Sequence, residues 1–129
     1  RNCSGAVEEL SDTMKTIEVR NNYVYAYYDG TNDVGTLIAL MQEVADICKK
    51  ENIIKLLADL SNMTGEPSII GRFQVGIAAV RIFKGMKKIA IVYKKVDSNR
   101  FAETVAVNRG LPSMVTHDME KAREWIESE

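Results

Sequence analysis

The chain has 129 residues, of which 46% are hydrophobic and 27% are charged, and its formal net charge is −1. This size and composition predict one globular domain with a single core and leave no room for a second domain. The apolar runs are short and interrupted by charges, well below the roughly 20 residues of a membrane span. A pI near 5.9, without basic motifs interleaved with aromatic residues, disfavours nucleic acid as a partner.

The first residues show neither an apolar signal core nor a strong period. We therefore treat residues 1–13 as a tail or short helical turn ahead of a domain at residues 14–129. Two cysteines are too few for a disulfide scaffold, and Cys48 falls on the apolar stripe of a predicted helix, whereas Cys3 lies in the tail. These features favour reduced thiols and a cytoplasmic location.

The predicted domain opens with an antiparallel hairpin. Residues 16–20 alternate between polar and apolar side chains, and residues 23–28 continue as a more apolar strand. Between them, Asn21 and Asn22 can take the positive φ angles of a tight two-residue turn.

A helix is predicted after the turn at Asp29-Gly30. Asn32 or Asp33 can cap it, and its apolar residues follow three-and-four spacing as far as Cys48. The next strand, at residues 53–60, is apolar on both faces except for Lys55, as expected where helices cover both sides of a sheet.

Ser68 can cap a second helix, which Gly85 ends. Its larger apolar side chains share one side and are expected in the core, or in a movable lid if the protein carries a ligand: Ile69, Ile70, Phe73, Ile77, Val80 and Phe83. Gly71 and Gly76 each weaken this helix by about 1 kcal/mol relative to Ala, which indicates close packing or mobility.

The remaining elements are a strand at residues 88–93, a third helix from Asp97 or Ser98 to Asn108, a strand at residues 113–116 and a final helix capped by Asp118. Strands separated by helices are mainly parallel. The fold class is therefore α/β: a single domain with a mostly parallel five-stranded sheet, an N-terminal antiparallel hairpin and four helices, in the order β-β-α-β-α-β-α-β-α.

The segment 56–61 (Leu-Leu-Ala-Asp-Leu-Ser) runs from a buried strand into polar residues. Open α/β sheets keep their sites at the carboxyl ends of strands, so Asp59 and Ser61 mark a candidate site. Asp59 can orient a loop, bind a cation or accept a phosphoryl group. A structural role, in which it accepts hydrogen bonds from loop N–H groups, is the commoner one.

The order of elements, the hairpin leading through Asp29-Gly30 into a helix, and Asp59-Leu60-Ser61 resemble the STAS domain, the fold of bacterial anti-sigma factor antagonists. Phe101-Ala102-Glu103 and Trp125-Ile126 resemble the stand-alone STAS-like group of the sporulation anti-sigma factor antagonist. Several members of that group also resemble the lipid-carrying CRAL-TRIO fold. The resemblance covers roughly Met14 to Glu129 and implies a non-catalytic binding or regulatory module.

In the signalling members of the family, an Asp-Ser pair opens the second helix and a partner kinase phosphorylates its Ser. Counting from Asp59, the resemblance places Ser68 at the phosphoacceptor position, although Pro67 stands where the acidic neighbour is expected. The N–H groups of a helix N-terminus favour a phosphate there. The simpler alternative is that Ser68 only caps the helix.

From Pro67 to Arg109 the chain has nine basic residues against two acidic ones. If they share a face, they would attract anionic lipid headgroups, a phosphorylated ligand or an acidic partner; an ordinary solvated surface is equally expected. The candidate ligand-binding residues are Arg72, Phe73, Lys94, Lys95 and Arg100.

The sequence contains few motifs that are typical of enzyme active sites. His117 is the single histidine, and neither a nucleophile elbow nor a Gly-rich phosphate loop is present. We therefore expect no catalytic residues, cofactor or metal site.

Three hypotheses remain, in this order. The first is a STAS-like module that binds a protein partner through residues 61–68 and the second helix. The second is a small carrier of lipid or another apolar anion, with a cavity under that helix and Arg72 or Lys94 near its mouth. The third is an enzyme acting on a small anionic substrate through Asp59. The tyrosines of the second strand are expected in the core, with a ligand cavity or homodimer interface as alternatives. Peripheral membrane contact also stays open.

Overall fold

The computed structural model describes residues 14–65, 68–94 and 107–128. The elements are β1 (Met14–Val19), β2 (Val24–Asp29), α1 (Val34–Glu51), β3 (Lys55–Asp59), α2 (Ile69–Ile82), β4 (Lys88–Val92), β5 (Ser113–Thr116) and α4 (Met119–Glu127). Three helices, rather than the predicted four, lie within these ranges. The helix predicted before Asn108 lies outside the described residues except at its end, where Val107 and Asn108 are helical. The predicted tail at residues 1–13 also lies outside them.

The strands form a single five-stranded sheet in the order β1-β2-β3-β4-β5. β1 and β2 are antiparallel, and every other neighbouring pair is parallel. This confirms the mostly parallel sheet with an antiparallel hairpin at its edge.

The turn of the β1–β2 hairpin differs from the prediction. Val19 pairs with Val24, and the amide of Arg20 donates to the carbonyl of Tyr23 at 2.9 Å. The predicted positive φ angles of Asn21 and Asn22 are wrong, because Asn52 is the one described non-glycine residue with a positive φ. Four residues separate the paired valines, and a loop of that length closes without left-handed residues.

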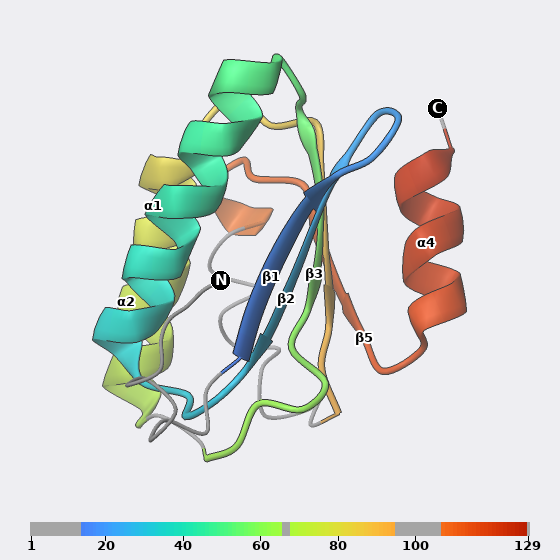
Figure 1. The fold of residues 1–129 in the computed structure, drawn as a ribbon. Coiled ribbons are helices and arrows are strands. Elements are labelled where there is room, and N and C mark those ends of the chain that lie inside the picture. Colours follow the sequence, from blue (N-terminus) through green and yellow to red (C-terminus); the bar gives the residue numbers. More distant parts are fainter. Residues whose placement is uncertain (1–13, 66–67, 95–106, 129) are drawn as a thin grey trace, which may run out of the picture.

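The helices form a layer on each face of the sheet (Figure 1). α1 and α2 lie side by side on one face, because right-handed crossovers between neighbouring parallel strands return to the same side. α4 covers the other face and packs against β3, β4 and β5. Among the described helices, none combines the length and apolar character needed to cross a membrane.

The alternation of β2 divides the core between these two layers. Val24, Ala26 and Tyr28 are buried on the side of α1 and α2. Tyr23 packs on the opposite side with Leu57 of β3 and with residues of α4, and Tyr25 lies against the same cluster. Tyr23 therefore contributes to the core beneath a helix.

The prediction that the apolar side of α2 faces the core is wrong for its first two turns. Ile69, Ile70 and Phe73 are 65%, 71% and 40% exposed. The buried positions of this helix are the small residues Gly71, Gly76 and Ala78. Because these small residues face inward, the bulky side chains that precede them in the first turn point outward.

Candidate functional site

Asp59 ends β3 on the face of the sheet that α4 covers, and it is 8% exposed. Its Oδ1 accepts hydrogen bonds from the amide of Ser61 at 3.1 Å and from the Ser61 hydroxyl at 2.6 Å. Its Oδ2 accepts a bond from the Tyr25 hydroxyl at 3.2 Å. Both carboxylate oxygens are thus engaged, and they fix the start of the loop after β3.

Tyr25 joins this carboxylate to the hairpin. Burial raises the pKa of its hydroxyl, and the negative charge of Asp59 raises it further. The Arg20 guanidinium lies 4.1 Å from the centre of the Tyr25 ring, within the range of a cation–π contact. The hydroxyl is therefore held protonated, as donation to Asp59 requires.

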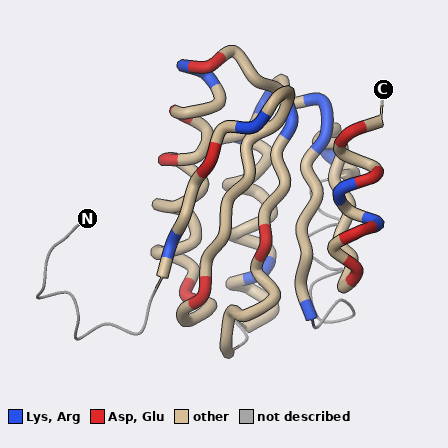
Figure 2. The backbone as a smooth tube through the Cα atoms, turned by 45° about the vertical axis from the view of Figure 1, so that its right-hand side comes forward, with Lys and Arg blue, Asp and Glu red and all other residues tan. Residues whose placement is uncertain are grey.

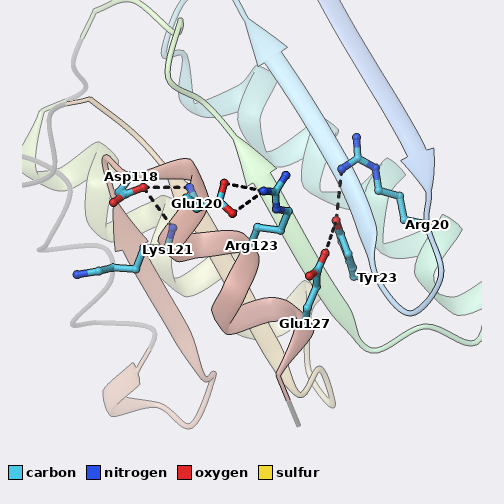
Figure 3. Close-up of polar contacts among 7 residues, drawn as sticks. All are labelled: Arg20, Tyr23, Asp118, Glu120, Lys121, Arg123 and Glu127. Carbon is cyan, nitrogen blue, oxygen red and sulfur yellow. Dashed lines mark hydrogen bonds and ion pairs between the residues drawn. The ribbon is translucent and has the colours of Figure 1, made fainter.

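A second polar chain links the hairpin to α4 (Figure 3). Arg20 donates to the Tyr23 hydroxyl at 3.3 Å, and that hydroxyl donates to Glu127 of α4 at 3.5 Å. Arg20 also pairs with Glu18 at 3.0 Å. The tyrosines of β2 thus place their rings on the sheet and their hydroxyls on polar partners at its border.

Ser68 caps α2 on the opposite layer. Its hydroxyl oxygen accepts the Gly71 amide at 3.0 Å, the bond of an N-cap. The described contacts of Ser68 and Asp59 have no partner in common. The structure thus brings Asp59 and Ser61 together, and it places Ser68 on the other side of the sheet.

A cavity of about 120 Å³ lies between the sheet and the layer of α1 and α2. Arg72, in the first turn of α2, is one of its lining residues, as are Asn32 and Ser113. The rest of the lining is apolar and comes from both helices and the sheet; examples are Leu37, Val44, Leu56, Val75, Ala79 and Ile91.

Of the other candidate ligand-binding residues, the two that the structure describes, Phe73 and Lys94, do not line this cavity. Phe73 instead faces an outer groove between α1 and α2. Lys94 is exposed beyond the end of β4. Lys95 and Arg100 lie outside the described residues.

The described basic residues of the segment 67–109 do not share one face. Arg72, in the first turn of α2, and Lys94, after β4, lie at the edge of the sheet where the parallel strands end, whereas Lys87 and Lys88 lie where β4 begins. Figure 2 shows Lys and Arg at both ends of the sheet. Lys55, at the start of β3, lies at the same edge of the sheet as the lysines at the start of β4. The positive charge is therefore divided between opposite edges.

Two of these lysines hold the end of α4. Lys55 is 7% exposed and donates to the Ser128 carbonyl at 2.8 Å. Lys88 donates to the Trp125 carbonyl at 2.8 Å and lies 5.1 Å from the centre of its ring. The sequence identified Lys55 as the polar exception in its strand. Its partner, Ser128, could not be predicted, because it lies 73 residues away in the sequence.

The described side chains offer little for catalysis. Within residues 14–65, 68–94 and 107–128, His, Cys, Asp and Glu do not gather in groups of three that could hold a metal ion. His117 is exposed between β5 and α4. Both oxygens of Asp59 accept hydrogen bonds from within the domain, from Ser61 and from Tyr25.

Comparison with known proteins supports the fold. No family model and no curated protein matches the sequence. An anti-sigma factor antagonist from Mycobacterium paratuberculosis superimposes with a TM-score of 0.62 and 15% identity, over 91% of this chain and 96% of that one. An uncharacterised protein from Shewanella loihica with a SpoIIAA-like fold gives 0.55 and 15%, over 97% and 99%. Together with the order of the sheet and its two helical layers, these similarities show that the chain has the fold of a STAS-like domain.

Proposed function

We propose that the chain is a non-catalytic regulatory module that binds a protein partner through residues 61–65 and the first turns of α2. The observation that carries this proposal is the exposure of Ile69, Ile70 and Phe73, which we call the α2 apolar patch. Large apolar side chains grouped on one surface mark interaction sites. The fold shared with an anti-sigma factor antagonist supports a regulatory role.

The surroundings of the α2 apolar patch indicate the chemistry of the partner. The Arg109 guanidinium lies 5.6 Å from the centre of the Phe73 ring. The outer groove beside Phe73 continues along Val34 and Ile38 of α1 and ends near Arg81. A protein surface with an apolar centre and acidic residues at its border would complement this arrangement.

Ser68 is the residue through which such binding would be controlled. It precedes Ile69, so a phosphate there would place about two negative charges at the edge of the α2 apolar patch. The first N–H groups of α2 would stabilise the phosphate in the free protein. An apolar interface would not, so we propose that modification of Ser68 by a partner kinase releases the partner.

Substitution of the α2 apolar patch tests the main proposal. The double variant Ile69→Ser with Ile70→Ser removes its two most exposed side chains, and Ile54→Ser is the matched control because Ile54 is 49% exposed elsewhere. We expect proteins retained by the wild type and the control from an extract of the source organism to be lost with the double variant. Equal retention by all three would refute the proposal, provided that circular dichroism shows each variant folded.

A second candidate function is that of a small-molecule carrier, which the cavity under α2 favours. Its volume of about 120 Å³ is close to that of an engineered cavity of roughly 150 Å³ that binds benzene. This size suits a small apolar molecule rather than a long lipid chain, and Arg72 in the lining supplies a positive charge. Native mass spectrometry of freshly purified protein should then show a stoichiometric passenger, and a bare mass would contradict it. The same spectrum reports whether the chain is a homodimer.

The enzyme hypothesis draws less support from the site. Asp59 is absent from the cavity lining, and both of its oxygens accept bonds from within the domain. A reaction centred on this carboxylate would first have to break those bonds.

A further inference from the structure

The cavity between α1, α2 and the sheet has a polar end. Asn32 precedes α1 and Arg72 lies in the first turn of α2, and both elements begin at the edge where the parallel strands end. Ser113 is the other polar residue of the lining, and its hydroxyl is engaged by the Leu111 carbonyl at 2.9 Å. A ligand in this cavity would therefore meet Asn32 and Arg72 at one end, Ser113 at the start of β5, and apolar side chains along its body.

Asn32 holds a polar atom that the fold leaves unsatisfied. Its amide N–H donates to the Thr64 carbonyl at 2.7 Å, and its Nδ2 donates to the Tyr93 hydroxyl at 3.3 Å. Its Oδ1 is buried and has no hydrogen-bond partner among the described residues. Buried acceptors without a donor are rare in folded proteins, because water solvates them better than an apolar interior does.

We propose that the cavity binds a small apolar molecule that carries a single hydroxyl group, with phenol as the simplest example. A hydroxyl donates one hydrogen bond, so it can satisfy Asn32 Oδ1. An ionised carboxylate has no proton to donate to Oδ1. This inference rests on the carrier candidate and narrows the class of its ligand.

The volume of the cavity limits the size of the apolar part of the ligand. About 120 Å³ accommodates one six-membered ring, because an engineered cavity of roughly 150 Å³ binds benzene. Residues such as Val75 and Ala79 of α2 and Leu56 of β3 supply the apolar walls for that ring. In a cavity with only apolar walls, phenol would bind less well than benzene, because its hydroxyl would lose its hydrogen bonds to water.

The order of affinities among three probes tests this inference. Phenol, benzene and benzoate are titrated into the full chain at pH 7, with two-dimensional NMR to follow the methyl groups that line the cavity. We expect a dissociation constant for phenol on the order of 1 mM. Benzene should bind roughly tenfold more weakly because it leaves Asn32 Oδ1 unpaired, and benzoate should bind more weakly than phenol.

Three variants separate the hydroxyl contact from the cavity itself. Asn32→Leu should abolish the preference for phenol over benzene, whereas Ser113→Ala, which removes the other polar side-chain oxygen of the lining, should keep it. Ala79→Leu fills the space and should abolish binding of every probe. If Asn32→Leu fails to fold, the order of the three probes in the wild type decides, with Ala79→Leu as the blank.

The outcomes distinguish this inference from the functions on which it rests. Benzene or benzoate binding as tightly as phenol would refute the hydroxyl contact and leave the carrier candidate standing. No shift of the lining methyl groups with any probe would refute both. Neither result bears on partner capture by the α2 apolar patch.

Discussion

The bond between Tyr25 and Asp59 allows a quantitative test of how the site is built. Tyr25→Phe removes the hydroxyl that donates to Asp59 Oδ2 at 3.2 Å. Asp59→Asn removes the negative charge of the group that accepts this bond. Hydrogen bonds to charged groups contribute about 1.5 to 3 kcal/mol. Because this bond is long and Tyr25 is partly exposed, we expect a coupling of about 1 kcal/mol between the two substitutions. Asp59→Asn alone should cost more, about 2 kcal/mol, because it also weakens the 2.6 Å bond from Ser61.

Urea unfolding at pH 7 of the wild type, both single variants and the double variant measures this coupling as a double-mutant cycle. Tyr28→Phe is the matched control on the same strand, because the Tyr28 hydroxyl donates to the Thr31 carbonyl at 2.8 Å on the other face of the sheet. Its cycle with Asp59→Asn should be additive within about 0.5 kcal/mol. Asp59→Asn should also lower the pKa of Tyr25 without returning it to its ordinary value, since burial is the larger cause of the shift.

Two results would refute this reasoning. A coupling below about 0.3 kcal/mol between Tyr25 and Asp59 lies within the error of additivity and would mean that the bond contributes nothing to stability. An equal coupling in the Tyr28 cycle would mean that Asp59→Asn acts through the whole sheet. In that case the loop after β3 is not held by the carboxylate alone.

Three further predictions concern single residues. Ser68→Ala should cost about 1 kcal/mol in urea unfolding because it removes the N-cap of α2, and Ser68→Asp should not; equal losses would contradict the capping role. Burial raises the pKa of Cys48 to about 11, so its stabilising contribution is complete below pH 8 and is lost as the pH rises to 11, because the unfolded thiol ionises first. Unfolding free energies across this range should fall by on the order of 2 to 3 kcal/mol, and Cys48→Ala should flatten that fall. Lys55→Met should cost about 1 to 2 kcal/mol and speed amide hydrogen exchange at the end of α4, since it deletes the bond to Ser128; unchanged exchange would show that Lys55 does not hold that helix.

Local signals in the sequence were sufficient for the first residues of the three described helices. Asp33, Ser68 and Asp118 each cap a helix in the structure as predicted, because capping depends on a side chain and the amides two or three residues later. The mostly parallel sheet followed in the same way, since strands that are joined by helices run in the same direction. The turn at Asn21 and Asn22 lies where it was predicted, and only the positive φ angles expected of these two residues were wrong.

Contacts between distant segments could not be predicted in this way. Lys55 was visible as a charge in an apolar strand, but its partner Ser128 lies in the last turn of the domain. The exposure of Ile69 and Ile70 depends on which residues of α2 fit closely against α1. Helical spacing alone does not predict that glycine rather than isoleucine occupies the face of α2 that packs there. The unpaired Oδ1 of Asn32 likewise follows from what surrounds it after folding.

The two faces of the sheet differ in how completely their polar groups are satisfied, and this difference locates function. On the face under α4, Asp59 and Lys55 have partners within the domain, so a ligand would have to displace bonds that stabilise the fold. On the side of α1 and α2, Oδ1 of Asn32 has no hydrogen-bond partner within the described part of the chain, and the α2 apolar patch is exposed. Natural proteins tend to depart from internal consistency at functional sites. We therefore expect a partner or ligand to engage the layer of α1 and α2 rather than Asp59, whose two oxygens accept bonds from Tyr25 and Ser61.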